Sequence, residues 1–340
     1  MFFETKIAET LRLTVAYHHA GKPGKPKLML IHGNASSSLF YLPLMKRLEE
    51  TFEMVAPDMR CFGETEALPV DAKRGMRDFS DDVDAFAEAI GWDSFSILGW
   101  SMGGGIAMQY AIDHSDKLEK IILQAPLSPF GFGGTYDEDG KKLEPLGIGS
   151  GGGCANAQLI SSLLDGKRDF IAQTIDGVYV APPYQIEPEL KEMFIDSVMT
   201  TRVGEGMYPG SKTAAPVWPF IAAGDDGVCN TMAPNFCDLS GLADIENKPD
   251  ILWIRGAQDI MVSDTSLCDL AYLGQIGAVP GWPGADVCPP QPMLKQTRFV
   301  LDKYKANGGF YQETVINGGH GCMLDNEDAF VKELLEFMER

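Results

Sequence analysis

The first 125 residues alternate between short apolar runs and longer segments whose apolar residues recur at helical spacing. Such alternation is typical of a mostly parallel sheet that is covered by helices on both faces. An early stretch, residues 11–17, alternates apolar and polar positions and predicts an antiparallel strand. The further strands are expected at residues 27–31, 52–56, 95–98 and 118–123, and the helices at 39–50, 79–90 and 106–112.

The regular alternation stops at about residue 125 and resumes near residue 246. Proline and glycine clusters divide the intervening part into short pieces, and a structureless loop of that length would be unusual in a compact domain. We therefore expect a helical lid over residues 126–245, with helices at 157–164 and 188–198, and a core made of residues 1–125 and 246–340. The elements expected after the lid are strands at 251–254 and 311–316 and helices at 293–304 and 329–338.

The pentapeptide from Gly99 to Gly103 has the pattern Gly-x-Ser-x-Gly and separates an apolar run from a helix-forming run. A serine in a tight turn from strand to helix is exposed and held beside a base, which is what a weak nucleophile needs. We predict that Ser101 is a nucleophile. The alternative is a glycine-rich turn in which the serine is incidental.

A serine nucleophile needs a general base, and the chain has five histidines. His320 follows the last predicted strand, at the sheet edge where parallel strands present reactive groups, so we assign the base to it. His114 lies near a helix end, where a structural role is expected. An acid must orient the imidazole, and Asp259 follows the strand at 251–254. Asp264 is the alternative, and either carboxylate could cap a turn instead.

Charge that develops on a carbonyl oxygen requires hydrogen-bond donors that are already in place. The main-chain N–H of Met102, the residue after the predicted nucleophile, is the first expected donor. The second is the N–H of Asn34, in the turn after the strand at 27–31, and its side chain could contribute as well. The alternative is a tight turn in which Asn34 caps a helix.

The overall charge of the 340-residue chain is −20, and its isoelectric point is about 4.6. This charge argues against nucleic acids and anionic membrane surfaces as partners and favours a small neutral or cationic molecule. No segment approaches the ~20 continuous apolar residues of a membrane span, and no secretory signal pattern begins the chain. We expect a cytoplasmic protein without a metal or organic cofactor. The sequence does not decide whether the protein is a monomer or a homo-oligomer.

The seven cysteines show no Cys-x-x-Cys pair, so a structural zinc site is not expected. Reduced and mostly buried thiols are the default expectation for this pattern. Disulfides between Cys229 and Cys237 or between Cys268 and Cys288 are the alternative, because each pair flanks a loop-like segment.

Five motifs together resemble the signposts of the α/β-hydrolase superfamily, and the resemblance extends over nearly the whole chain. It implies an α/β-hydrolase fold with a helical lid inserted after the sixth strand, and a triad of Ser101, Asp259 and His320 in the order that the fold uses. Cys61 stands where many relatives have glycine. The 265–291 loop is longer than usual and is expected either to join the lid or to form a surface loop. The motifs are His32-Gly33-Asn34, the stretch from Pro57 to Gly63, Gly99 to Gly104, Gly256 to Asp259, and Gly319-His320.

These residues favour hydrolysis of a carboxylic ester or lactone through an acyl-enzyme intermediate. The serine excludes the aspartate-nucleophile branches, which are the epoxide hydrolases and haloalkane dehalogenases. Carbon–carbon bond or amide hydrolysis with the same triad remains an alternative, as does a non-catalytic ligand receptor on this scaffold. An apolar substrate is suggested by the many lid aromatics, Tyr179 among them, although such residues are more often lid core. Our candidates for substrate contact are Trp100, Ala35, Trp218 and Trp282.

Overall fold

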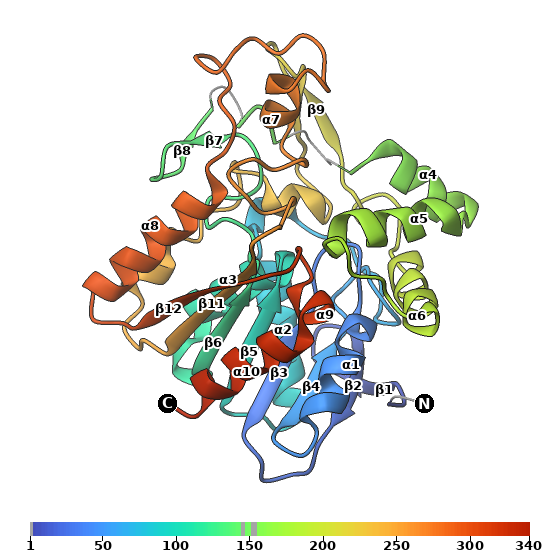
Figure 1. The fold of residues 1–340 in the computed structure, drawn as a ribbon, viewed down its shortest axis with the longest axis vertical. Coiled ribbons are helices and arrows are strands. Elements are labelled where there is room, and N and C mark those ends of the chain that lie inside the picture. Colours follow the sequence, from blue (N-terminus) through green and yellow to red (C-terminus); the bar gives the residue numbers. More distant parts are fainter. Residues whose placement is uncertain (1–2, 144–146, 151–154) are drawn as a thin grey trace.

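The central element of the protein is an eight-stranded sheet (Figure 1). In the computed structural model, residues 3–143, 147–150 and 155–340 are described. The two amino-terminal strands pair in antiparallel fashion, and the remaining six run parallel to one another. The strand order is β1 (Lys6–Glu9), β2 (Thr14–Ala20), β4 (Glu53–Pro57), β3 (Lys27–Ile31), β5 (Phe95–Trp100), β6 (Leu118–Gln124), β11 (Asp250–Gly256) and β12 (Tyr311–Ile316).

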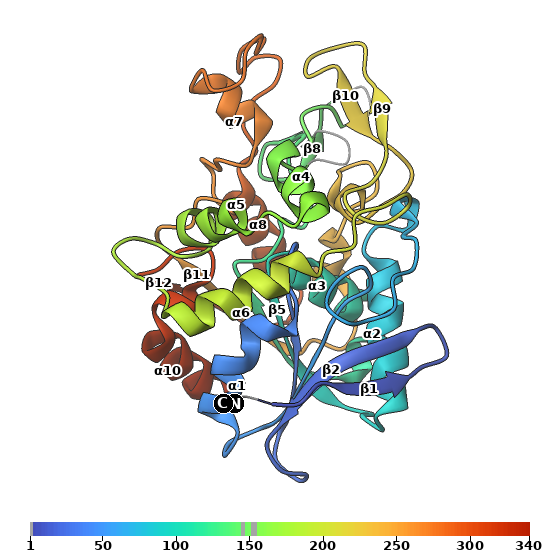
Figure 2. The ribbon, with the colours of Figure 1, turned by 90° about the vertical axis from the view of Figure 1, so that its right-hand side faces the viewer.

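Helices cover both faces of this sheet, as Figure 2 shows. One face carries α1 (Leu42–Leu48) and α10 (Glu327–Met338), and the other carries α2 (Arg77–Ala89) and α3 (Met102–His114). The middle strand β5 is buried along its whole length, which explains its continuous apolar sequence. The fold is therefore the α/β-hydrolase fold, as expected. The other core helices are α8 (Met293–Ala306), α9 (Cys322–Asp325) and the 3₁₀ turns η1 (Ser38–Tyr41), η2 (Ala72–Arg74) and η3 (Ser115–Lys117), while a further 3₁₀ turn, η6 (Ser240–Asp244), ends the segment between β6 and β11.

Two elements near the amino terminus differ from the expectation. The early strand begins at Thr14, three residues later than predicted, and continues through His18 and His19 because it pairs with β4 along those residues. His18 is consequently buried, and its Nδ1 lies 2.8 Å from the Ser38 hydroxyl oxygen. The helix expected at 39–50 is divided into η1 and α1, since Pro43 lies at the start of α1, where a missing N–H costs nothing.

The segment between β6 and β11 lies above the sheet in Figure 1 and includes the two helices expected in the lid. We call residues 126–245 the cap, and the division of the chain into core and cap remains a prediction. Its helices are α4 (Ala157–Asp165), α5 (Arg168–Thr174), the π-helical turn η4 (Ile175–Tyr179), α6 (Pro188–Met199) and the 3₁₀ turn η5 (Cys229–Met232). Its strands are β7 (Thr135–Tyr136), β8 (Lys141–Lys142), β9 (Lys212–Ala214) and β10 (Ile221–Ala223).

The 265–291 loop contains α7 (Leu270–Gln275) and packs against the cap. A second hydrophobic cluster, separate from the main core, joins the two segments. Among its buried members, Leu143, Ile148, Ala215, Trp218 and Ala222 come from the cap, and Ala271 and Cys288 come from the loop. The loop is therefore attached to the cap by apolar burial.

Cys237 and Cys288 are present as thiols, so the structure contains neither of the disulfides that the loops could have accommodated. Among the described residues, no helix combines the length and the apolar character that crossing a membrane requires.

Candidate active site

Ser101 occupies a strained turn between β5 and α3, with a φ of 58° and a ψ of −119°. Such a backbone conformation costs free energy in a residue other than glycine, so it persists when the surroundings enforce it. The close approach of the flanking backbone does so: a Cβ on Gly103 would lie 2.2 Å from the Ile31 carbonyl oxygen, and one on Gly99 would lie 2.2 Å from the Gly103 carbonyl oxygen. The sequence therefore needs both glycines to form this turn, and Ser101 is left partly exposed.

His320 and Asp259 lie together after the neighbouring strands β12 and β11. His320 Nδ1 lies 2.9 Å from Asp259 Oδ2, and both side chains are almost completely buried. The other carboxylate oxygen, Oδ1, accepts hydrogen bonds from the N–H groups of Met261 at 2.7 Å and Val262 at 3.0 Å. These donors fix the orientation of the carboxylate, and the carboxylate fixes the orientation of the imidazole ring. Nε2 of the ring takes no part in the contact with Asp259.

The alternative acid, Asp264, has a different partner. Its Oδ1 accepts a 2.8 Å hydrogen bond from the N–H of Leu294, in the first turn of α8. A carboxylate at this position satisfies a helix N–H that has no intrahelical acceptor. Asp264 thus caps a helix, and the structure brings Asp259 to the histidine. His114, the other histidine considered, ends α3 and lies 3.9 Å from an Asp84 carboxylate oxygen.

Trp100 links the serine turn to the segment that contains His320. Its indole N–H donates a 3.0 Å hydrogen bond to the main-chain carbonyl of His320, and the two rings lie 5.5 Å apart. Because Trp100 precedes Ser101 directly, this bond joins the two turns across 220 residues of sequence. The hydroxyl of Ser101 makes no hydrogen bond with any described residue, and the contact between this hydroxyl and the His320 imidazole stays a prediction.

The turn after β3, residues 32–35, is called the β3 loop here, and it packs directly on Ser101. A Cβ on Gly33 would lie 3.1 Å from the Ser101 Cβ, which is tighter than most contacts between Cβ atoms. Met102 is the first residue of α3, so its N–H has no intrahelical acceptor. Asn34 lies in this loop, and its Oδ1 is buried with no hydrogen-bond partner among the described residues. Both predicted oxyanion donors thus lie on segments that flank the serine.

His32 anchors the β3 loop. Its Nε2 accepts a 2.9 Å hydrogen bond from the N–H of Met59, so Nδ1 carries the proton and donates it to the Gly33 carbonyl at 2.8 Å. Complete burial lowers the pKa of His32 to about 4, against the hydrogen bond to Gly33, which raises it. The neutral ring therefore ties the loop after β3 to the loop after β4.

Of the four candidates for substrate contact, two lie in the second hydrophobic cluster. The indole N–H of Trp218 donates to the Pro280 carbonyl, and that of Trp282 donates to the Cys288 carbonyl. Both rings fill the contact between the cap and the 265–291 loop, which is a packing role. Trp100 is buried against Phe40 and the histidine. Ala35 is buried in the β3 loop with a φ of 47°.

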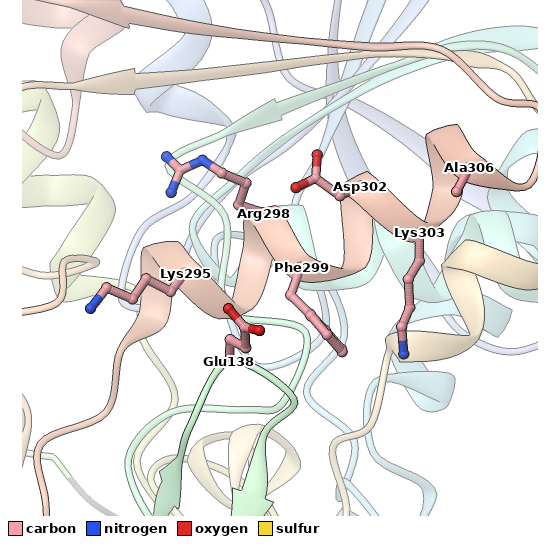
Figure 3. Close-up of a pocket in the computed structure, with 7 residues that line it drawn as sticks. All are labelled: Glu138, Lys295, Arg298, Phe299, Asp302, Lys303 and Ala306. Atoms are coloured by element: carbon pink, nitrogen blue, oxygen red, sulfur yellow. The ribbon is translucent and has the colours of Figure 1, made fainter.

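A surface groove of about 420 Å³ lies elsewhere, along α8 (Figure 3). Glu138, from the turn between β7 and β8, faces the helix there, and the charged groups along the helix include Lys295, Arg298 and Asp302. Arg298 is already paired with Glu313 at 2.7 Å. None of the predicted site residues lines this groove. Within the described part of the chain, no group of three or more His, Cys, Asp or Glu side chains is arranged to hold a metal ion.

Two residues of this neighbourhood were not predicted. Tyr179 donates a hydrogen bond from its hydroxyl to the β3 loop, and Asp325 accepts one from the N–H of Gly319, next to His320. Their partners are main-chain groups, which have no sequence signature. The sequence shows Tyr179 as one of many aromatic residues of the lid, and nothing in the sequence distinguishes it from the others.

Comparison with known proteins agrees with this fold. The family model for the alpha/beta hydrolase fold matches residues 26–145. Haloalkane dehalogenase 2 of Mycobacterium tuberculosis is 27% identical over 121 residues, which are 36% of this chain. The chain thus spans 41% of the length of that relative.

Solved structures match over the whole chain. An enol-lactonase from Burkholderia xenovorans aligns with 98% of this chain and all of its own, at a TM-score of 0.61 and 14% identity. An esterase from Exiguobacterium antarcticum aligns with 99% of this chain and all of its own, at a TM-score of 0.60 and 16% identity. At these identities the likeness concerns the fold. Together with the family model, these matches confirm the resemblance to the α/β-hydrolase superfamily.

Proposed function

We propose that this protein is a serine hydrolase that cleaves a carboxylic ester or lactone through an acyl-enzyme intermediate. The observation that supports this most is the 2.9 Å pair of His320 and Asp259, together with the hydrogen bond from Trp100, the residue before Ser101, to the His320 carbonyl. A histidine oriented by a buried acid is the base that a serine nucleophile needs. The esterase and the lactonase of similar fold are consistent with this chemistry.

Each step has a residue in this site. Ser101 Oγ attacks the carbonyl carbon while His320 Nε2 takes its proton, and Asp259 stabilises the resulting imidazolium. The N–H groups of Met102 and Asn34 bind the oxyanion of the tetrahedral intermediate. His320 then gives the proton to the departing alcohol, which leaves an acyl group on Ser101. Water, activated by the same imidazole, attacks the acyl group and releases the acid.

The identity of residue 101 separates this proposal from the activity named in the haloalkane dehalogenase relative. The aspartate-nucleophile branches of this fold need a carboxylate at the strand-to-helix turn, and this chain has a hydroxyl there. A serine forms an acyl-enzyme with a carbonyl substrate, which the dehalogenation of an alkyl halide does not provide. The ester reaction therefore fits this chain better.

The substrate that we propose is a small, neutral and largely apolar ester or lactone. The chain carries a charge of −20, so it repels anionic substrates at long range. Aromatic side chains pack around Trp100, the residue before Ser101: Phe40 contacts the Trp100 ring and stacks on Phe194 of the cap, and Tyr179 packs against Trp100. Apolar walls with a few placed polar groups are typical of sites for small apolar molecules.

The experiment that tests this proposal is a substrate panel with two serine variants. p-Nitrophenyl esters of increasing acyl length are assayed beside aryl and macrocyclic lactones. Ser101→Ala should lower kcat/KM for the best substrate by at least about 10⁴-fold while substrate binding persists. Ser96→Ala is the matched control, because the Ser96 hydroxyl is buried in β5 without a hydrogen-bond partner among the described residues. Full activity in Ser101→Ala would refute the proposal, and binding without turnover by the native protein would favour a receptor.

A further inference from the structure

A short piece of the cap, residues 179–181, contacts both loops that flank Ser101. One is the β3 loop, and the other is the segment 317–321, called the histidine loop here. Tyr179 ends the π-helical turn η4, and the chain then continues in extended conformation at Val180. In residues 179–181, the Tyr179 side chain contacts the β3 loop, and main-chain groups bind the histidine loop and its neighbour Asp325.

The side chain of Tyr179 is bound to the β3 loop. Its hydroxyl donates to the carbonyl of Ala35 at 3.1 Å and lies 3.4 Å from the carbonyl oxygen of Asn34. The ring is buried edge-on against Trp100, with the ring centroids 5.4 Å apart. Burial raises the pKa of Tyr179 well above its ordinary value, so the hydroxyl remains a donor across the working pH range.

The main chain of the same piece is bound to the histidine loop. The N–H of Gly321 donates to the Tyr179 carbonyl at 2.6 Å. Two residues further on, the N–H of Ala181 donates to Asp325 Oδ2 at 2.7 Å, and the same oxygen accepts from the N–H of Gly319 at 2.7 Å. The two neighbours of His320 are therefore both connected to this piece of the cap, Gly321 directly and Gly319 through Asp325.

We propose that Tyr179 is a positioning residue that holds the β3 loop, with its oxyanion donor Asn34, in fixed register with the histidine loop. This inference rests on the proposed function, since it assigns a role in the same site. An oxyanion donor is effective only when it is in place before the reaction, because reorganisation during the reaction costs free energy. The β3 loop needs such an external restraint, since Ala35 has the unfavourable φ of 47°.

The kinetic test is Tyr179→Phe, which keeps the ring and removes the hydroxyl. One lost hydrogen bond to a buried carbonyl should lower kcat about tenfold and leave KM within about twofold, since the loop acts on the transition state. Tyr304→Phe is the matched control. Tyr304 is also buried, and its hydroxyl donates to the Pro249 carbonyl at 2.6 Å, but it lies on α8 outside the site. Unchanged kcat in Tyr179→Phe, or an equal loss in both variants, would overturn the inference.

A second measurement is independent of any substrate. Amide hydrogen exchange should be about tenfold faster in peptides covering residues 33–40 in Tyr179→Phe, and unchanged there in Tyr304→Phe. If exchange at residues 33–40 is the same in both variants, Tyr179 does not hold the loop. If the native protein hydrolyses no ester while exchange responds as stated, the proposed function fails and the loop restraint stands. The two ideas therefore fail separately.

Discussion

Asp259 Oδ2 lies 2.9 Å from Nδ1 of His320, and the other carboxylate oxygen, Oδ1, accepts hydrogen bonds from two main-chain N–H groups. In the proposed mechanism Asp259 is a carboxylate that accepts at both oxygens, and the proton between the two side chains lies on His320 Nδ1. His320 Nε2 is then the unprotonated nitrogen, which is the state that a general base for Ser101 requires.

Asp259→Asn should lower kcat by about 10³ to 10⁴-fold and change KM little, because an amide N–H directed at Nδ1 favours the wrong tautomer. The assay is ester hydrolysis with the best substrate of the panel. Asp264→Asn is the control, since it keeps an oxygen that can accept the Leu294 N–H. Equal activity of Asp259→Asn and the native enzyme would remove Asp259 from the mechanism.

Gly103→Ala should destabilise the protein by about 3 kcal/mol or prevent folding, because the new Cβ would lie 2.2 Å from a main-chain oxygen of β3. Gly241→Ala offers the contrast, since its nearest neighbours would be 3.9 Å away. Urea denaturation of both variants measures the difference. Comparable stability for the two would mean that α3 does not pack on β3 as closely as described.

Cys61 differs from Gly103, because it is a residue with a side chain at a position whose left-handed backbone conformation favours glycine. It has a φ of 71°, is buried, and its thiol contacts the Leu68 carbonyl oxygen at 3.2 Å. Burial raises the pKa of Cys61 to about 12, which favours the protonated thiol at neutral pH. The turn thus keeps the conformation that glycine favours.

Cys61→Gly should therefore be about 1 kcal/mol more stable than Cys61→Ala, although glycine is normally the less stable of the two. Both variants lose the thiol, so the difference isolates the backbone strain. The free energies of unfolding in urea provide the measurement. A more stable alanine variant would show that the turn relaxes away from the positive φ.

His32 predicts a pH dependence of stability. Its pKa is lowered to about 4 in the folded protein by burial, from about 6.5 in the unfolded chain. The unfolded state therefore binds the proton more tightly, and stability that is fully present above pH 6.5 is lost as the pH falls toward 4, by about 3 kcal/mol in total. The NMR signal of the His32 ring should stay unchanged down to about pH 5. A titration midpoint near 6.5 would contradict the buried neutral ring.

The sequence predicts the parts of the candidate site that depend on local spacing. The turn at Ser101 needs glycines two residues away on each side, and this requirement is visible in the chain. The preference for Asp259 over Asp264 rests on its shorter distance to a strand end in the sequence, and in the structure Asp259 pairs with His320 while Asp264 caps a helix. The mostly parallel sheet was predicted from the alternation of elements, because strands joined by helices pair in parallel.

Other contacts could not be predicted, because they join side chains to main-chain groups far away in sequence. Tyr179 and Ala35 are 144 residues apart, and nothing in either residue type indicates the pairing. Trp218 and Trp282 illustrate a different difficulty. A large aromatic in a lid suits a pocket wall and a small core equally well, and their packing in the second cluster is decided by tertiary structure.

The proposed nucleophile can be tested most directly by treating the native protein with a fluorophosphonate and locating the adduct by peptide mass spectrometry. Phosphonylation should occur on Ser101 and be lost in Ser101→Ala, and His320→Ala should lower its rate by several orders of magnitude. An intact protein without adduct, or a label on another serine, would contradict the account.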